Sequence, residues 1–285
     1  MLDNTQLATK LTKKYSDQFT ATRNRTFGLP KARINSNEWI FRRLITNVMV
    51  AGSNEDNVIT ATKEIFKQYP KMKDLAAATQ SSLVEIMNRN NVRFSGRKAN
   101  NIIDIAISII TQECGIVPHD RATLEAMPGV GRHTASTVLS LAFDMPSMGV
   151  DLHVRRIAKR IGLVGEKATD KKIEDILSKD VDAELLAQYS RAFVEFGKEI
   201  CGFDPNCAKC FLKAKCPTAQ GTVKVTKKAE TVKVSGKKVV DGRYGIVAGS
   251  SDREYFVTVS GDKVSCNCKG YRFKRTCSHV KEIAG

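Results

Sequence analysis

The sequence lacks any long apolar run and any apolar N-terminal segment. A helix that spans a bilayer needs about 20 apolar residues, and no such stretch occurs in the 285 residues. The first 20 residues also lack the apolar centre of a secretory signal peptide. The apolar content of 42% still suffices to bury a core. We therefore expect a globular intracellular protein, in the cytoplasm and nucleoid or in a nucleus, that contacts no membrane.

Acidic residues are few relative to basic ones. Lys and Arg number 46 and Asp and Glu 30, which gives a net charge of +16. Half of this excess lies in residues 218–285, which hold 14 basic and 6 acidic side chains, a net charge of +8. Such a balance favours a polyanionic partner such as nucleic acid, and a basic surface that only confers solubility is the alternative.

Disulfides are not expected, because eight cysteines without a secretory signal favour metal sites or reactive thiols. Seven of the cysteines and one histidine fall into two clusters. The first cluster is Cys201, Cys207, Cys210 and Cys216, and the second is Cys266, Cys268, Cys277 and His279. Cys114 stands alone in an apolar run, where we expect an inert, half-buried thiol.

Apolar residues recur every three or four positions from residue 39 to about residue 199, which predicts a mainly helical region. Its first four helices are predicted at residues 39–50, 58–69, 81–90 and 97–113. Residues 221–240 are rich in Lys and lack this period, so we interpret them as a basic linker. Three later segments alternate like strands, at 243–249, 254–260 and 263–266, and predict a small separate domain.

The segment "MPGVGRHTA" separates two predicted helices, 120–127 and 132–143, and the three together predict a helix–hairpin–helix. Gly129 and Gly131 allow a tight turn and bring backbone N–H groups close to a bound phosphate. Asp151 directly precedes "LHVRRIAKRIGL", where its carboxylate is placed to cap the next helix.

The run "LEAMPGVGRHTASTVLSLAFDMPSMGVDLHVRRIAKRIGL", with "RKANNIIDIA" before it, resembles the endonuclease III family of DNA glycosylases over roughly residues 30–217. The resemblance implies a mainly α, two-domain helix–hairpin–helix glycosylase fold with an iron–sulfur cluster loop. The strand-like segments and the second cysteine cluster add a small C-terminal α+β zinc-finger module to this expectation. The expected domains are an N-terminal segment (1–37) packing with the iron–sulfur domain, a six-helix barrel with the hairpin (38–148), the iron–sulfur domain (149–217), a basic linker (218–240) and the zinc finger (241–285).

The family's activity implies a DNA N-glycosylase of base excision repair, which flips a damaged or mismatched base out of double-stranded DNA and breaks its glycosidic bond. Asp151 matches the family's catalytic aspartate, whose carboxylate stabilises the oxocarbenium ion or positions the nucleophile. A plain helix cap is the alternative role, and the two are compatible. The hairpin residues expected to hold DNA are Pro128, Gly129, Val130, Gly131, Arg132 and Thr134.

His133 departs from the family. Members with lyase activity carry lysine at this position, 2 residues after Gly131 and 18 before Asp151, and its amine forms a Schiff base with the sugar. Imidazole makes no stable imine, so we expect a monofunctional enzyme with weak or absent lyase activity. The helix N-terminus and Arg132 should keep His133 neutral. It would then orient water or contact the base or phosphate, and a bystander role is the alternative.

Two further positions limit the substrate. Adenine-excising members of the family bear a glutamate at the position that corresponds to Asn47 in the resemblance. Asparagine cannot protonate a purine, so adenine excision of that type is not expected. Relatives insert a glutamine beside the flipped nucleotide where this chain has Gly52. Phe94 is the candidate to fill the vacated stack instead.

The first cysteine cluster, C-x5-C-x2-C-x5-C, resembles the family's 4Fe–4S loop, and a zinc site with four cysteine ligands is the alternative. The first gap is one residue shorter than usual and lacks basic residues, so DNA contact is expected from Lys209, Lys213 and Lys215. We expect the cluster to be structural.

The second cluster, C-x-C-x8-C-x-H, resembles a SWIM zinc finger, in which Cys266, Cys268, Cys277 and His279 hold Zn²⁺. Basic residues among the ligands, interleaved with aromatic ones, suit contact with single-stranded or distorted DNA, and a protein partner is the alternative. These basic residues are Lys269, Arg272, Lys274 and Arg275.

The leading hypothesis is therefore a monomeric, monofunctional DNA glycosylase with Asp151 as its catalytic residue. The second hypothesis is a bifunctional glycosylase in which another amine supplies the lyase activity. A lesion-binding protein without catalysis is the third, and the presence of Asp151 weighs against it.

Overall fold

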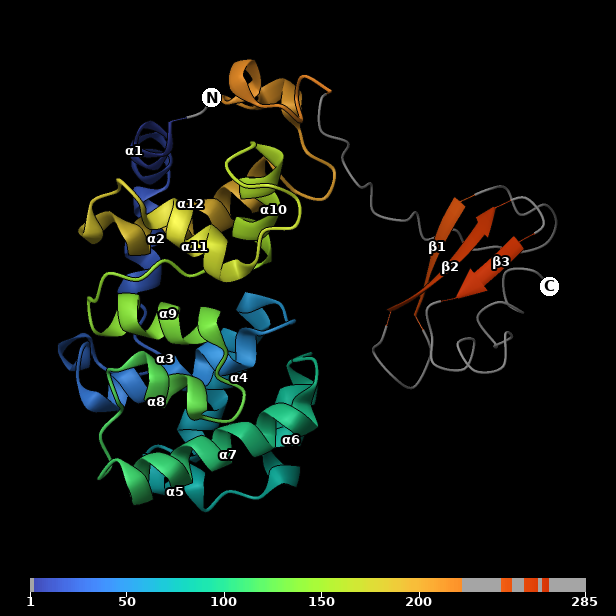
Figure 1. Ribbon diagram of the computed structural model, residues 1–285. Coiled ribbons are helices and arrows are strands. Elements are labelled where there is room, and N and C mark those ends of the chain that lie inside the picture. Colours follow the sequence, from blue (N-terminus) through green and yellow to red (C-terminus); the bar gives the residue numbers. More distant parts are fainter. Residues whose placement is uncertain (1–2, 222–241, 248–253, 261–262, 267–285) are drawn as a thin grey trace. The chain divides into compact units, whose positions relative to one another are not determined.

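The computed structural model describes residues 3–221, 242–247, 254–260 and 263–266 (Figure 1). The chain divides into two compact units, Met1–Val225 and Thr226–Gly285, each of which is described by itself. None of the described helices is long and apolar enough to cross a membrane.

The first unit is helical. Its helices are α1 (Asn4–Lys14), α2 (Ser16–Arg23), α3 (Asn37–Val50), α4 (Glu55–Gln68), α5 (Met72–Ala76), α6 (Gln80–Arg89), α7 (Ser95–Gln112), α8 (Arg121–Ala126), α9 (Arg132–Ala142), α10 (Leu152–Arg160), α11 (Asp170–Ser178) and α12 (Leu186–Glu199). The helices predicted from periodicity and the helix–hairpin–helix are confirmed as α3, α4, α6, α7, α8 and α9.

Local sequence explains where these helices begin. Ser36, Asn54, Thr79 and Asp120 each precede a helix and accept a hydrogen bond from a backbone N–H of its first turn. α7 has no such cap, because it starts after Phe94, whose side chain accepts no hydrogen bond and whose φ of +59° is left-handed.

Two hydrophobic cores divide the helical unit. One lies among α3 to α9 and contains Trp39, Leu44 and Ile105. The other brings α1 together with α10 to α12 and the chain beyond them, around Leu11 and Phe193. Figure 1 shows the two halves stacked, with α9 next to the half that holds α10 to α12. The N-terminal helix thus completes a core whose other helices lie more than 130 residues later in the chain. The predicted boundaries at 37/38 and 148/149 stay predictions.

The second unit contains three antiparallel strands, β1 (Gly242–Val247), β2 (Glu254–Ser260) and β3 (Lys263–Cys266), in the order β1-β2-β3. Gly245 pairs with Phe256, and Val257 pairs with Cys266. The strand predictions are confirmed. Cys268, Cys277 and His279 lie outside the described residues, as do the basic residues among them (Lys269, Arg272, Lys274 and Arg275).

Cys114 corrects one expectation. The thiol is exposed, not half-buried, because α7 ends at Gln112 and the chain turns outward through Cys114 and Gly115 with φ values of +51° and +77°. Apolar periodicity predicted the helix but not the turn that ends it.

Candidate functional site

The hairpin turn is built around Gly129. Its φ of +76° lies in the left-handed region, and a Cβ there would collide with the amide of Asn101 on α7. Gly131 has a φ of −96°, which any residue adopts, and nothing lies within 4 Å of the place a Cβ would take. The expectation that both glycines serve the turn is therefore wrong for Gly131, and only Gly129 is required by the backbone.

Backbone dominates the outer surface of the hairpin. Pro128 and Gly129 are exposed, whereas the side chains of Val130 and Thr134 are buried. α9 begins at Arg132 without a side-chain cap, so no capping group covers the amides of its first turn. Any contact that Val130 and Thr134 make with DNA must run through their N–H groups.

Arg132 is held within the protein. Its Nε donates to Oε2 of Glu174 on α11 at 2.6 Å, and Arg121 donates to Oε1 of the same carboxylate at 3.0 Å. Glu174 is only 13% exposed. Arg132 would have to share its charge between this carboxylate and a DNA phosphate.

Asp151 is the N-cap of α10. Its Oδ1 accepts a hydrogen bond from the backbone N–H of Val154 at 2.8 Å, and the side chain is half-buried. Within the described part of the chain, Oδ2 accepts no hydrogen bond. One carboxylate oxygen therefore serves the helix, and the other is left for chemistry.

His133 lies in the first turn of α9, against the segment that leads to Asp151. A Cβ on Gly149 would lie 3.1 Å from Nδ1 of His133 and 3.3 Å from the hydroxyls of Thr137 and Ser190. Ser190, on α12, donates to the carbonyl of Gly149 at 2.8 Å. The absence of a side chain at Gly149 thus makes room for the imidazole.

Burial lowers the pKa of His133 from its ordinary value. The charges of Asp151 and Asp170 raise this pKa, that of Arg155 lowers it, and the net shift is downward. His133 as a whole residue is exposed, but the protein atoms packed around its ring make desolvation the largest cause of the shift. This direction agrees with the expected neutral form, and its largest cause is desolvation, which the sequence did not suggest.

His153 is a second imidazole near Asp151 that the sequence did not single out. Arg156 lies 3.1 Å from its Nδ1, and a guanidinium only donates, so Nδ1 accepts and the neutral ring carries its proton on Nε2. Burial lowers the pKa of His153, and Asp151 raises it. Asp151 is therefore flanked by two imidazoles that favour the neutral form.

Gly52 and Phe94, which lie 42 residues apart in the sequence, meet in the structure. A Cβ on Gly52 would lie 3.0 Å from Cε2 of Phe94, and Gly52 has a φ of +68°. Phe94 is 45% exposed, an unusual state for a phenylalanine. Asn47 on α3 has a buried Nδ2 with no hydrogen-bond partner among the described residues.

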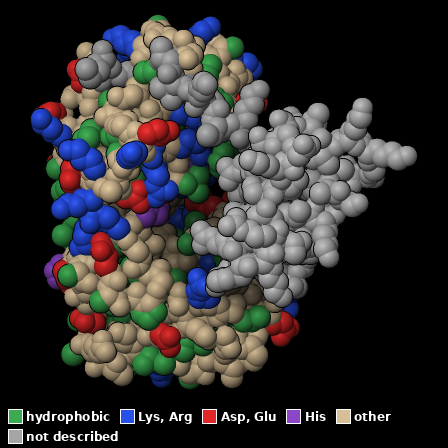
Figure 2. Space-filling model, turned by 45° about the vertical axis from the view of Figure 1, so that its right-hand side comes forward, with side chains coloured by type: hydrophobic (Ala, Val, Ile, Leu, Met, Phe, Trp, Pro, Cys, Tyr) green, Lys and Arg blue, Asp and Glu red, His purple; other side chains and the backbone are tan. Residues whose placement is uncertain are grey.

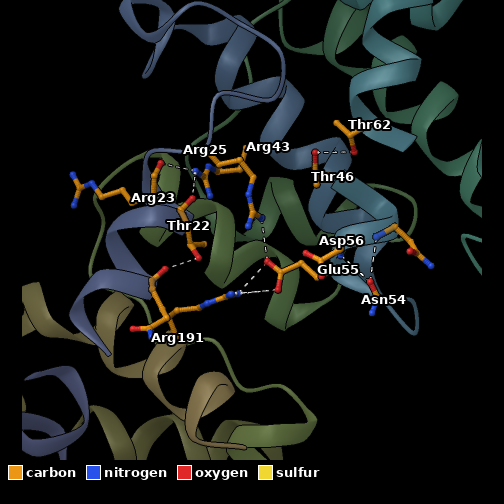
Figure 3. Close-up of polar contacts among 12 residues, drawn as sticks. Thr22, Arg23, Arg25, Arg43, Thr46, Asn54, Glu55, Asp56, Thr62 and Arg191 are labelled. Carbon is orange, nitrogen blue, oxygen red and sulfur yellow. Dashed lines mark hydrogen bonds and ion pairs between the residues drawn. The ribbon is translucent and has the colours of Figure 1, made fainter. Parts of the chain in front are cut away.

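An ion-pair network joins the two halves of the helical unit. Glu55, at the start of α4, accepts hydrogen bonds from Arg25 at 3.0 Å and from Arg191 on α12 at 3.2 Å, and Lys198 lies 3.2 Å away. Figure 3 shows Arg25 and Arg191 pointing toward Glu55 from two sides. Burial raises the pKa of Glu55, but Arg191 and Lys198 outweigh it and the net pKa falls to about 2.

Glu55→Gln is expected to destabilise the protein by about 2–3 kcal/mol at pH 7, because it removes the carboxylate that Arg25, Arg191 and Lys198 share. Arg191 then keeps only Glu195, at 2.6 Å, as its acidic partner among the described residues. A carboxyl whose pKa is lowered on folding contributes stability above its unfolded value of 4.5. That contribution disappears as the pH falls toward about 2. The free energies of unfolding of the wild type and Glu55→Gln, measured in urea, should therefore differ at pH 7 and converge only as the pH falls to about 2.

The matched control is Glu85→Gln, whose side chain is 78% exposed and 3.8 Å from Arg89. It should change the free energy of unfolding by less than about 0.5 kcal/mol. Equal effects of the two substitutions would show that Glu55 does not tie the halves together.

The first cysteine cluster gathers at the end of α12. Its four cysteines line one pocket of about 320 Å³, a volume that includes space open to solvent. Arg160 borders the pocket and donates to the carbonyl of Phe203 at 2.9 Å, and the N–H of Leu212 donates to Sγ of Cys210 at 3.4 Å. Burial raises the pKa of Cys201 and of Cys210.

The four thiols and the amide aimed at one sulfur fit a cluster held by four cysteines better than a solvent-exposed thiol group. Cys201 comes directly after Ile200, the C-cap of α12, so the shorter first gap starts from a helix end. Within the described residues, no three Cys, His, Asp or Glu side chains are spaced to hold a single metal ion.

Basic side chains border this region. Lys209, Lys213 and Lys215 are exposed on the short helical turns after Cys207.

Figure 2 shows one face of the molecule hollowed at mid-height, where a histidine lies among acidic and basic side chains, with further Lys and Arg beside and above it. A polyanion would meet a positive surface there.

Comparisons with known proteins agree with this arrangement. Residues 45–183 match the HhH-GPD superfamily of base excision DNA repair proteins. Endonuclease III of Thermotoga maritima is 34% identical over 177 residues, which cover 62% of this chain and 82% of that protein. Endonuclease III of Escherichia coli K12 is 32% identical over 178 residues, with 62% and 82% covered.

Solved structures give the same result. A trapped endonuclease III–DNA covalent intermediate, an estranged-adenine complex, is 28% identical with a TM-score of 0.67, and the match covers 78% of this chain and 99% of that one. A thermostable thymine-DNA glycosylase, at 21% identity and a TM-score of 0.59, shares the fold, with 74% and 99% covered. The chain therefore belongs to the endonuclease III family of the HhH-GPD superfamily.

Proposed function

We propose that this protein is a monofunctional DNA glycosylase, which hydrolyses the N-glycosidic bond of a damaged or mismatched base in double-stranded DNA. One observation carries the proposal. Asp151 keeps a free carboxylate oxygen beside a helix start at which a desolvated imidazole, His133, replaces an amine. The site offers a negative charge and a neutral proton acceptor, and position 133 itself carries no amine for a Schiff base.

In this mechanism the flipped base leaves as its glycosidic bond to C1′ breaks, and positive charge develops on the sugar. Oδ2 of Asp151 stabilises that charge, while Oδ1 stays bonded to the N–H of Val154 and fixes the orientation of the carboxylate. Water attacks C1′ and loses a proton to Asp151 or to neutral His133. Thr137 donates to the backbone carbonyl of His133 at 2.9 Å, and Ser190 donates to that of Gly149 at 2.8 Å, which fixes the two backbone segments on either side of the imidazole.

The hairpin and the residue Phe94 hold the DNA in this proposal. The uncapped amides at the start of α9 bind a phosphate, and exposed Phe94 enters the space that the flipped base leaves. The lysines after Cys207 contact a neighbouring phosphate. Opposite the flipped base, Gly52 offers no side chain with which to read the partner base.

The four cysteines of the pocket at the end of α12 would hold a 4Fe–4S cluster, which ties residues 201–216 into one rigid loop. Arg160 would order that loop from α10 by binding the carbonyls of Gly202 and Phe203. Cys266, Cys268, Cys277 and His279 would hold one Zn²⁺ in the second unit.

Metal analysis of the purified protein is expected to give about four iron atoms and about one zinc atom per chain. Cys210→Ser should lower the iron content and leave zinc, whereas Cys277→Ser should do the reverse. Plasma mass spectrometry measures both metals in one sample. Loss of both metals from either variant would contradict two separate sites.

Residues 218–285 are proposed to tether the enzyme to single-stranded or distorted DNA. Deletion of this segment, with its net charge of +8, should flatten the dependence of log affinity on log salt concentration, because fewer counterions are released. Fluorescence anisotropy at several salt concentrations measures the slope. An unchanged slope would assign the segment to a protein partner instead.

The substrate is tested by mass spectrometry of released bases from duplexes with uracil, mismatched thymine, oxidised pyrimidines, alkylated bases or deaminated purines. We expect release of one class of base, and slower release from the same strand without its complement. If no base is released from any duplex, the proposed enzymatic activity is wrong and the lesion-binding hypothesis stands in its place.

A further inference from the structure

Lys98 is a buried lysine without a carboxylate partner. It lies on the apolar face of α7 with Ile102 and Ile105, and its side chain is only 4% exposed. Among the described residues no Asp or Glu forms an ion pair with it. Burial, and to a smaller extent Arg93, lowers the pKa of Lys98 to about 8. A methionine would fill the same space without this cost, so the amine has a use beyond packing.

The amine of Lys98 is hydrogen-bonded to the hydroxyl of Ser53, in the turn before α4. Nζ of Lys98 donates to Oγ at 2.7 Å, and the backbone N–H of Arg93 donates to the same oxygen at 3.0 Å. The hydroxyl itself donates to the carbonyl of Arg93 at 3.5 Å. One donor and two acceptor positions are all that a serine hydroxyl has. Ser53 therefore joins the 51–53 turn, the backbone of residue 93 and α7 at one atom.

Phe94 is the residue that this junction supports. Its left-handed φ of +59° is costly for an aromatic residue and persists only where the surroundings enforce it. The residue before Phe94 is fixed by Ser53, and the amide of Lys98 donates to the carbonyl of Phe94 at 3.1 Å. The ring rests on Gly52 and lies 5.9 Å from Nζ of Lys98.

We propose that Lys98, acting through Ser53, is a positioning residue that holds Phe94 ready to enter the DNA stack. Lys98 is fixed at both ends of this arrangement, since its backbone bonds Phe94 and its amine bonds Ser53. Loss of the amine frees the loop to adopt an unstrained conformation, in which the ring no longer rests on Gly52. The inference rests on the proposed function only in taking DNA as the ligand.

The test uses a duplex with a tetrahydrofuran abasic site and 2-aminopurine as the opposite base, whose fluorescence rises when an inserted side chain unstacks it. Full-length wild-type protein should raise the fluorescence. Phe94→Ala should abolish the rise, because it removes the inserting ring. Lys98→Met and Ser53→Ala should each lower the rise about fivefold at saturating protein, the factor for one lost hydrogen bond. Ser53→Thr, which keeps the hydroxyl, and Lys63→Met, on the exposed face of α4, should match the wild type.

A wild-type rise with both Lys98→Met and Ser53→Ala, while Phe94→Ala lacks it, would overturn the role of Lys98. A wild-type rise with Phe94→Ala would overturn the inference as a whole. Circular dichroism separates misfolding from loss of positioning, and Ser53→Ala covers the case in which Lys98→Met fails to fold. Because the assay needs no base release, a protein that inserts Phe94 but excises nothing would refute the proposed function and leave this inference standing.

Discussion

Asp151→Asn is expected to lower the rate of base release by about a thousandfold under single-turnover conditions, without weakening DNA binding. The substitution removes the negative charge that stabilises the sugar cation. It keeps the helix cap, because asparagine accepts a hydrogen bond at an N-cap as well as aspartate does. The bond from Val154 to Oδ1, at 2.8 Å, can therefore persist.

The matched control is Asp120→Asn. Asp120 caps α8 as Asp151 caps α10, with Oδ1 accepting from the N–H of Thr123 at 2.8 Å, but it is exposed and outside the proposed site. Both variants should unfold within about 1 kcal/mol of the wild type in urea. If Asp151→Asn and Asp120→Asn both change the rate of base release only slightly and equally, Asp151 serves only as a helix cap.

His133→Lys is expected to add lyase activity to the monofunctional glycosylase, so that the variant also cleaves the DNA strand. The new amine would stand on the first turn of α9, in surroundings that already lower the pKa of the imidazole. The same desolvation should lower the pKa of the lysine and raise its nucleophilic fraction. Borohydride trapping should give a covalent protein–DNA adduct at least about a hundredfold more abundant than with the wild type.

His133→Arg is the control for charge, because its guanidinium is cationic but not nucleophilic. It should give no adduct. Trapping of the wild type as efficient as that of His133→Lys would mean that another amine already serves as lyase. The absence of trapping in His133→Lys would place position 133 too far from the sugar for either role.

Local sequence patterns were sufficient to predict most of the helices. Apolar spacing located α3, α4, α6 and α7, and the hairpin motif located α8 and α9, whereas the short helix α5 was not predicted. The run from the hairpin to Asp151 is continuous in the sequence, so its motif could be recognised directly. Gly129 was predictable because a left-handed turn leaves few alternatives. The neutral form of His133 was also predicted, but its cause was not, since burial depends on residues distant in the sequence.

Contacts between residues far apart in the chain could not be predicted from the sequence. Ser190 and Arg191 on α12 meet Gly149 and Glu55, which lie 41 and 136 residues earlier, and no local period signals such pairs. Lys98 gave one signal that could have been used, because it falls on the apolar face of α7. A lysine at such a position must find a polar partner.

The central claim, hydrolysis without strand cleavage, is tested most directly by a single-turnover reaction on a duplex with the excised base and a labelled strand, each sample split before analysis. Half is treated with alkali, which cuts at abasic sites, and half is not. The account predicts an intact strand before alkali and a cut strand after it, at the rate of base release. Equal cleavage in the untreated half would contradict it and show that the wild-type protein is a lyase.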